Sequence, residues 1–479
     1  MTTTTSTTRD GAMRLVAPLA RTALALAASI GLALAATAPA QAHGDAHKDR
    51  TRAASITAAS LPALSAKNAT LVDSVPGKAG ISGCFMPTAP IFVMSSLDSI
   101  TVFDASDPRH PVQLGVLPNL VFENEAMNCG ERKVGQSVER FALIGVDTYD
   151  VSADIDHTSE AAGGKQLIVV DVTDPKAPRL RSTAPATTST HTVACVDAKD
   201  CRYAYSAGGR TTFSLMDLTD LDAPVEVDAD PQVAGTQPHA TPTGGHKWNF
   251  DDAGFATHTG YNGSAVFDVR DPLHPALVTT TGAAGRGLAE DGTKNGYNDF
   301  IHHNSSRPNA SAFQPDAAPS FANGNVLLVT EEDYEDVNCS TAGSFQTWWV
   351  KRLDGTPDAI VPLDKVELAD LGSFPSPVGA FCSAHWFDWH PSGIVTVGYY
   401  GGGTQLIDAR DPRNLTPWGH AVHGASEVWD SYFVPVYNNA DRRTDRRTNI
   451  AWSVDLVRGL DVYEVTLPSS TPKVNGLVR

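Results

Sequence analysis

The 479-residue sequence contains no Cys-x-x-Cys pair and no Gly-x-Ser-x-Gly segment. The first absence argues against a zinc ribbon or a thioredoxin-like redox site, and the second argues against the nucleophile elbow of an α/β-hydrolase. Residues 401–403 are three consecutive glycines, but they join two predicted strands, whereas a phosphate-binding loop leads from a strand into a helix. No spacing of Ser, His and Asp supports a catalytic triad. The common short catalytic motifs are therefore excluded.

Positive charge is scarce. The chain has 36 Lys and Arg against 54 Asp and Glu, which gives a formal net charge of −18. Without residues 1–42, which hold three Arg and one Asp, the net charge is −20. Such a surface repels nucleic acid and anionic lipid and attracts cations. We therefore expect no nucleic-acid partner.

Only one long apolar run occurs, at residues 22–37, and Arg14 and Arg21 precede it. The run is shorter than the roughly 20 residues that a transmembrane helix needs. It is followed by Ala40-Gln41-Ala42, which fits the small-x-small rule for signal cleavage. We predict a signal peptide at 1–42, a flexible linker at 43–67, and an exported chain with no membrane insertion after cleavage. An uncleaved anchor is the alternative.

One motif recurs along the chain: a short β-rich run followed by Asp, two residues and Asp-Pro. Asp side chains cap turns by accepting backbone N–H groups, and Pro cannot continue a β-ladder, so each copy predicts a strand that ends in a turn. Four complete copies lie at 100–108, 167–175, 264–272 and 404–412. The copy at 213–220 keeps both Asp residues but lacks the Pro, and two degenerate copies lie at 347–355 and 460–465.

A second apolar run precedes each copy, and further strands are expected before and after each pair. The second runs lie at 91–96, 141–146, 203–208, 255–260, 325–332, 394–400 and 450–455. Repeats of roughly 40–60 residues with four strands each are typical of propeller blades. We therefore predict an all-β, seven-bladed β-propeller over residues 68–479. The last unit lacks a fourth strand, and residues 69–75 are predicted to supply it and close the ring.

The repeat resembles that of the LVIVD-repeat family, because residues 167–171 read Leu-Ile-Val-Val-Asp. The resemblance covers most of the chain after the signal peptide. It implies an exported β-propeller and says nothing about activity. A more distant similarity, at the level of the fold and of histidines in a propeller, relates the chain to the selenium-binding protein and methanethiol oxidase group.

Aligning the predicted first strands of the blades brings ligand-type side chains to one position. In a propeller the first strands line the central channel, so these side chains are expected to form a ring at one end of it. The six residues are Glu125, His191, His246, His303, His385 and Glu427. Imidazole and carboxylate together suit copper, zinc or iron better than calcium. The alternative is a plug of polar side chains hydrogen-bonded to water and to one another.

Other polar residues fall close to this end of the predicted channel. His302 competes with its neighbour His303 for the ring position, and we prefer His303. The turns between the second and third strands carry Asp147, His258, Glu331, Glu332 and Asp455, which can extend the site. Ordinary turn chemistry and surface charge explain this second set equally well.

The six cysteines are an even number, which in an exported chain favours disulfides. Cys84, Cys129 and Cys195 share a register in the first-strand alignment, and Cys195 and Cys201 bracket a short connection. The two that remain are expected to tie a long loop of the fifth blade to the first strand of the sixth. We predict the pairs Cys84–Cys129, Cys195–Cys201 and Cys339–Cys382.

Two classes of function follow from these observations. One is a metal-dependent oxidoreductase or lyase with a His/Glu site at the mouth of the channel. The other is a non-catalytic extracellular binding module that uses its loop face. Either class predicts a small molecule or an extracellular ligand on the channel face, and we expect a monomer.

Overall fold

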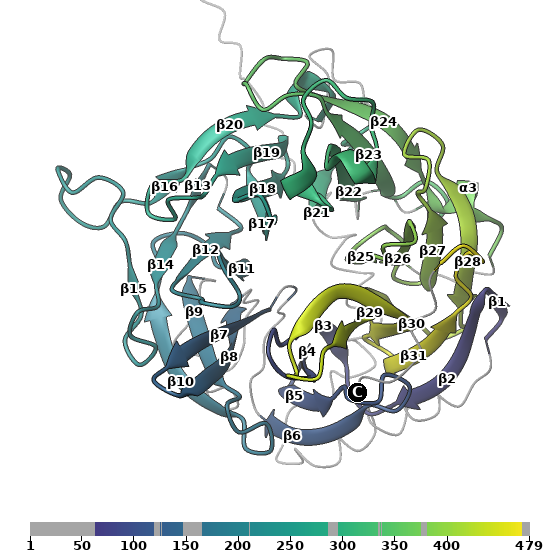
Figure 1. The fold of residues 1–479 in the computed structure, drawn as a ribbon, viewed down its shortest axis with the longest axis horizontal. Coiled ribbons are helices and arrows are strands. Elements are labelled where there is room, and N and C mark those ends of the chain that lie inside the picture. The colour runs from purple at the N-terminus through teal and green to yellow at the C-terminus, as the bar shows by residue number, and fades with distance from the viewer. Residues whose placement is uncertain are drawn as a thin grey trace, which may run out of the picture. The chain divides into compact units, whose positions relative to one another are not determined.

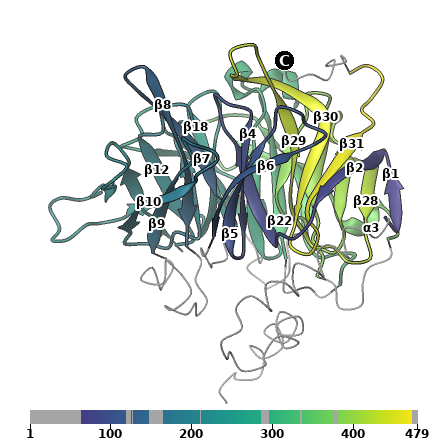
Figure 2. The ribbon, with the colours of Figure 1, turned by 90° about the horizontal axis from the view of Figure 1, so that it is seen from below.

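A computed structural model describes residues 63–118, 125, 127–146, 165–209, 211–285, 296–333, 336, 338–374 and 381–471. The predicted signal peptide and Asp147 lie outside these residues. Seven antiparallel sheets follow one another around a ring, as Figure 1 shows from one end of the channel and Figure 2 from the side. The prediction of a seven-bladed β-propeller is confirmed.

The first four blades each consist of four strands that are consecutive along the chain, apart from one small insertion in blade 3. Blade 1 is β3 (Gly80–Phe85), β4 (Ile91–Ser96), β5 (Ser99–Asp104) and β6 (Val112–Pro118); blade 2 is β7 (Asn128–Val134), β8 (Ser137–Gly145), β9 (Gln166–Asp171) and β10 (Arg179–Pro185). Blade 3 is β11 (Thr192–Cys195), β12 (Tyr203–Ala207), β14 (Leu215–Asp217) and β15 (Val225–Glu226); blade 4 is β17 (Gly245–Phe250), β18 (Phe255–Gly260), β19 (Gly263–Asp268) and β20 (Ala276–Thr280). A two-stranded sheet of β13 (Thr212–Phe213) and β16 (His239–Ala240) adjoins blade 3.

The last three blades complete the ring. Blade 5 is β21 (Ile301–Ser306), β22 (Val326–Glu332), β23 (Ser344–Val350) and β24 (Ile360–Val366); blade 6 is β25 (Phe387–Trp389), β26 (Ile394–Gly398), β27 (Thr404–Asp408) and β28 (Thr416–Val422). Blade 7 is β29 (Val428–Tyr437), β30 (Arg443–Asp455) and β31 (Gly459–Val465) with β2 (Ala69–Val75). The described helices are short: η2 (Gly282–Gly285), η3 (Ala310–Ala312), η4 (Phe321–Asn323) and α3 (Leu368–Leu371).

The ring closes through the N-terminal strand, as predicted. Ala69 pairs with Val465 and Val75 with Leu460, so β2 covers the edge that β31 would otherwise expose. The structure adds one strand that the sequence did not predict. Within the predicted linker, β1 (Ser65–Lys67) pairs with β28 and becomes a fifth strand of blade 6. The N-terminal segment therefore ties blades 6 and 7 together.

The recurring Asp residues act as the motif predicts. Asp104 at the end of β5 accepts the backbone N–H of Ser106 over 2.8 Å, and Asp171 at the end of β9 accepts that of Thr173 over 2.9 Å. The Asp that precedes Pro repeats the bond in the following turn, since Asp107 accepts the N–H of Arg109 over 3.0 Å. The third strand of blade 1 thus ends in two successive side-chain caps.

The hydrophobic core lies between neighbouring blades. Phe92 of blade 1 packs edge-on against Trp452 of blade 7 with ring centroids 5.2 Å apart. Tyr205 of blade 3 packs in the same manner against Trp248 of blade 4, at 5.2 Å. These side chains are fully or almost fully buried. Packing between blades holds each first strand in a fixed place at the channel.

All six cysteines are paired, and the three predicted pairs are confirmed. The Cys84–Cys129 bond joins the first strands of blades 1 and 2, and the Cys195–Cys201 bond closes the connection between β11 and β12. Three disulfides indicate an oxidising, extracellular environment. Within the described part of the chain, no helix combines the length and the hydropathy of a membrane span.

The third disulfide corrects one detail of the prediction. Cys339 lies on the connection between β22 and β23 of blade 5, as expected, and it bonds to Cys382. Cys382 is not on the first strand of blade 6, however, because it lies five residues before β25 begins. It is almost fully buried in the hydrophobic cluster between blades 5 and 6. The bond therefore anchors the segment that leads into β25, the segment that also carries His385.

Candidate metal centre

The six predicted ring residues all lie at the starts of first strands. Four are histidines: His191 directly precedes β11, His246 is the second residue of β17, His303 is the third residue of β21, and His385 lies two residues before β25. Glu125 lies three residues before β7, and Glu427 directly precedes β29. Neighbouring strands of the ring therefore deliver their imidazoles side by side. Ring centroids are 4.6 Å apart for His191 and His246, and 4.0 Å apart for both His246–His303 and His303–His385.

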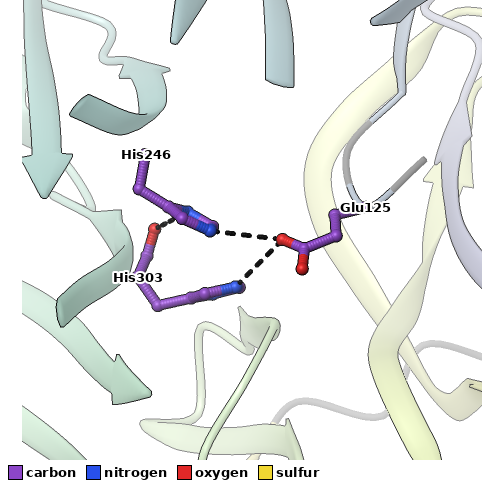
Figure 3. Close-up of side chains that lie close together, drawn as sticks. All are labelled: Glu125, His246 and His303. Atoms are coloured by element: carbon purple, nitrogen blue, oxygen red, sulfur yellow. Dashed lines mark hydrogen bonds and ion pairs between the residues drawn. The ribbon is translucent and has the colours of Figure 1, made fainter. Parts of the chain in front are cut away.

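The carboxylate of Glu125 faces three of these imidazoles. Its Oε2 atom lies 3.1 Å from Nε2 of His191, 3.2 Å from Nε2 of His246 and 3.4 Å from Nε2 of His303. Figure 3 shows Glu125 reaching across from the opposite side to His246 and His303. The Nε2 atoms of His191 and His246 are themselves 2.9 Å apart. Oε2 of Glu125 thus contacts imidazoles from three other blades, and the donor atoms of Glu125, His246 and His303 all lie within 4.8 Å of one another.

The distances fit one bound ion. Four ligand atoms placed tetrahedrally at 2.0–2.1 Å from a metal would lie about 3.3 Å from one another. Within the group Glu125, His246 and His303, the contacts of 3.2 and 3.4 Å from Oε2 of Glu125 to the two Nε2 atoms bracket that value. These pairs need adjustments of only a few tenths of an ångström to share an ion.

The hydrogen bonds of two imidazoles fix which nitrogen faces the centre. Nδ1 of His246 lies 3.0 Å from the carbonyl oxygen of His303, and Nδ1 of His385 lies 2.7 Å from that of Trp429. A carbonyl only accepts, so Nδ1 carries the proton in both rings and Nε2 presents its lone pair to the channel. This is the arrangement in which histidine binds a metal.

A second group of donors adjoins the first and shares His303 with it. Nε2 of His303 lies 3.7 Å from Oε2 of Glu332, the last residue of β22, and Nε2 of His385 lies 4.0 Å from Oε1 of the same carboxylate. Tyr400 donates its hydroxyl to Oε1 of Glu332 over 2.7 Å and so orients that carboxylate. Glu125, His246 and His303 on one side, and His303, Glu332 and His385 on the other, are two groups that can each hold an ion.

Several of these atoms are buried without a hydrogen bond to the described residues. They are Oε2 of Glu125, both ring nitrogens of His303, and Nε2 of His385. The side chains of His303 and His385 have no solvent exposure. Buried polar atoms without partners carry a desolvation cost, which a bound cation removes.

The electrostatic surroundings favour the ionisation states in which these side chains can bind a metal. Burial alone would raise the pKa of Glu125, but the charge of His191 and the polar contacts with His246 and His303 hold it well below its ordinary value. Burial lowers the pKa of His246, of His303 and, to about 4, of His385. An anionic Glu125 beside the neutral imidazoles of His246 and His303 is the state that binds a metal.

Glu427, the sixth predicted ring residue, belongs to neither group of donors. Its Oε1 accepts a hydrogen bond from the indole of Trp429 over 3.0 Å, and burial raises its pKa to about 6. The backbone N–H of Glu427 donates to Asp455, which also accepts from Ser426 and caps the following turn. The structure thus places Glu427 and Asp455 in hydrogen bonds of blade 7.

Two other histidine candidates point into the blades. His302 bonds through Nδ1 to Ser264 over 2.9 Å and through Nε2 to the carbonyl of Tyr297 over 2.7 Å, so the preference for His303 agrees with the geometry. Nδ1 of His258 lies 2.7 Å from the hydroxyls of both Thr241 and Thr243, and its ring stacks on an indole.

Glu331 likewise serves its own blade. It accepts hydrogen bonds from the backbone of Asp299 and from the hydroxyl of Ser344, and burial raises its pKa to about 7. The next residue, Glu332, points the other way and reaches the donor groups, because successive side chains of a strand face opposite sides. Of the described turn residues that the sequence suggested as extensions, Glu332 is the one that the structure brings to the imidazoles.

Trp429, two residues after a ring position, was expected to give the site an apolar layer, and its ring lies 5.2 Å from that of His385. Two further aromatic residues beside the imidazoles, Trp386 and Tyr400, were not predicted from the sequence. The ring of Trp386 lies 4.5 Å from that of His303, and Tyr400 lies 4.6 Å from His385. Tyr400 has φ of 48°, a left-handed conformation that is rare for a large side chain and that occurs at functional sites. Its position before three glycines was the available signal, since such a segment admits unusual backbone geometry.

No model of a known protein family matches the chain, and no curated protein matches it. Among solved structures, it is similar to the β-propeller domain of Cps50 (Swd1) from Myceliophteria thermophila. The identity is 11%, the TM-score is 0.48, and the match covers 83% of this chain and 100% of the other. The fold and the candidate site are therefore assigned from the strand pairings and contacts described above.

Proposed function

We propose that this chain is an exported β-propeller that binds a transition metal at the mouth of its central channel and uses it as an oxidoreductase. The ion would be held by Glu125, His246 and His303, with His191, His385 and Glu332 directly beside them. The observation that carries the proposal is the buried group of Glu125, His246 and His303, whose donor atoms lie within 4.8 Å of one another, with Nε2 of His191 3.1 Å from the same carboxylate oxygen. Nitrogen-rich ligand sets of this kind suit copper, iron or zinc.

The surroundings support a redox role over a purely structural one. Trp386, Tyr400 and Trp429 pack around the imidazoles and shield them from solvent. A shielded site controls which molecules reach the ion and sets its potential through the low polarity of its walls. The repeat residues also favour kinship with the LVIVD-repeat propellers, which are exported. We further infer that the chain is a monomer and that its ligand is a small molecule on the channel face.

Elemental analysis of protein purified without chelators tests the proposal. We expect close to one equivalent of copper or iron in the wild-type protein, and less than a tenth of that in the double variant His246→Ala/His385→Ala. Zinc instead of copper or iron would contradict the oxidoreductase, because zinc does no redox chemistry.

A wild-type protein that holds no metal and takes up neither copper, iron nor zinc would contradict the metal site itself. The polar residues of the channel mouth would then be a hydrogen-bonded plug, and the non-catalytic binding module would be the better interpretation. The variant His274→Ala is a matched control, because its imidazole is exposed and pairs with Asp271 on the outer surface.

A further inference from the structure

A cavity of about 230 Å³ lies in the channel beside the imidazoles. Its walls come from the residues that follow the metal donors along the first strands: Lys247 and Asn249 after His246, Asn304 after His303, and Trp386 after His385. The cavity is smaller than the roughly 300–1,000 Å³ of pockets for drug-sized ligands. It therefore suits a small compound.

Lys247 is the most unusual wall residue. Its side chain lines the cavity and is 6% exposed, yet its ammonium makes no hydrogen bond or ion pair with the described residues. Its contact is with an aromatic face, since Nζ lies 4.9 Å from the centre of the Trp386 ring. An ammonium buried without an anionic partner is costly, and an anion in the cavity would remove that cost.

The other charges leave the cavity positive. Arg443 and Arg447 also line it, and Asp388 is occupied by an ion pair with Arg447 at 3.4 Å. Burial raises the pKa of Asp430 well above its ordinary value, which favours its neutral form. Among the described residues, neither Lys247 nor Arg443 forms an ion pair with a carboxylate within 4.0 Å, although more distant carboxylates, such as Asp430 for Lys247, interact with them electrostatically.

The remaining walls are apolar or offer amide groups. Phe85, Phe387 and Phe433 line the cavity together with Met127. Asn249 donates to the side-chain oxygen of Asn304 over 2.9 Å, which leaves the amide nitrogen of Asn304 able to donate to a ligand. Cations on one part of the wall and aromatic rings on another fit a molecule that has one anionic end and one apolar end.

We propose that this cavity is a binding site for a small organic carboxylate with an apolar or aromatic body, and that Lys247 holds its carboxylate. The ring of Trp386 contacts both Lys247 and His303, so the ligand would lie one aromatic ring away from the metal donors. The cavity site goes beyond the proposed function and does not need the ion, because none of the six metal donors lines the cavity.

Calorimetric titration of the full-length protein with benzoate tests the proposal. We expect benzoate to bind at least tenfold more tightly than benzamide, which has the same ring and no charge, and than sulfate, which has charge and no ring. Lys247→Gln should weaken benzoate at least tenfold and leave benzamide unchanged. Lys199→Gln removes an exposed lysine and is the matched control.

A second variant covers the case in which Lys247→Gln does not fold. Asn128 lines the cavity and accepts the backbone N–H of Cys195 through its side-chain oxygen, a bond that Asn128→Asp keeps while adding a negative charge. It should weaken benzoate at least fivefold. Equal affinity for benzoate and benzamide, or for benzoate and sulfate, would overturn the proposal.

Repeating the titration on protein stripped of metal with a chelator tests the cavity site independently of the metal site. Benzoate binding that persists without metal supports the cavity, even if the wild-type protein proves to hold no metal. Binding that needs the metal and ignores Lys247→Gln would overturn the cavity site and leave the metal proposal intact.

Discussion

Two sets of buried histidines in this propeller have opposite surroundings. In the channel, His246 and His385 bond through Nδ1 to a backbone carbonyl and direct Nε2 at other ligand-type side chains. Inside the blades, His302 bonds through both nitrogens to its own and the neighbouring blade, and His258 bonds to threonine hydroxyls. Burial is nearly complete in both sets. The difference lies in what the second nitrogen faces, and that decides whether an imidazole is able to bind a metal.

The neighbours His302 and His303 give the sharpest form of this comparison. His303→Ala is expected to remove almost all bound metal, because it deletes a donor that both ligand groups share. His302→Ala should keep the metal and instead lower the free energy of unfolding by about 3 kcal/mol, through lost hydrogen bonds and a new cavity. Elemental analysis and denaturant unfolding of both variants check this. Equal metal loss in the two would remove the distinction.

Added metal should distinguish the channel histidines from the blade histidines by its effect on the free energy of unfolding. A ligand that binds only the folded state at a free concentration of 1,000 times its Kd raises the free energy of unfolding by about 4 kcal/mol. Metal-depleted wild type and His302→Ala should both gain this stability when copper, iron or zinc is added, whereas His303→Ala should not. Thermal unfolding with and without the ion is the measurement. A gain in His303→Ala would show that the ion binds elsewhere.

Acid should unfold the protein partly through His390, a buried histidine that directly follows β25. Burial lowers the pKa of His390 to about 4, and its Nδ1 accepts the backbone N–H of Ser392 over 2.9 Å, so the folded state keeps the ring neutral. Below pH 6.5 the unfolded chain binds a proton that the folded chain does not. Stability therefore falls by up to about 1.4 kcal/mol per pH unit, and this loss stops growing near pH 4.

The variant His390→Asn isolates that contribution. Asn can accept the same N–H and does not titrate, so unfolding measured from pH 7 to 4 should show a shallower loss than in the wild-type protein. An unchanged slope would mean that His390 is protonated in the folded state.

The smallest effect is expected at the hydroxyls around His258. Thr241→Val removes one of two hydroxyls that lie 2.7 Å from its Nδ1, while Thr243 keeps the ring in place. The free energy of unfolding should fall by about 1 kcal/mol, with no change in metal content. Metal loss in this variant would link the blade histidines to the channel after all.

Sequence determined the architecture because the architecture repeats. The Asp-Pro motif marked the third strands, the apolar runs marked the second strands, and the missing last strand identified residues 69–75 as the closure. The shared register of Cys84 and Cys129 followed from the same alignment, and so did the position of the four channel histidines. Ring symmetry converts an equal position in each repeat into proximity in space, so these predictions needed only the period.

The partners Cys339 and Cys382 show where the period stops being informative. Both lie on connections between strands, so no register relates them, and they were paired because the other four cysteines had partners. The pair is correct, but the start of β25 after Cys382 was not predicted. Connections vary from blade to blade, and the repeat therefore sets neither their length nor their path.

Tertiary structure decided what symmetry does not fix. Glu332 and Glu331 are adjacent, and only the pleat of β22 shows which one reaches the imidazoles. Glu427 holds the same repeat position as the histidines, yet its carboxylate bonds to Trp429, two residues further along the chain. Nothing in the sequence around Lys247 predicts a buried ammonium without an ion pair, because that property depends on residues of other blades that surround it. Side-chain direction and pairing depend on every neighbour at once, and a single repeat carries no information about the neighbours across the channel.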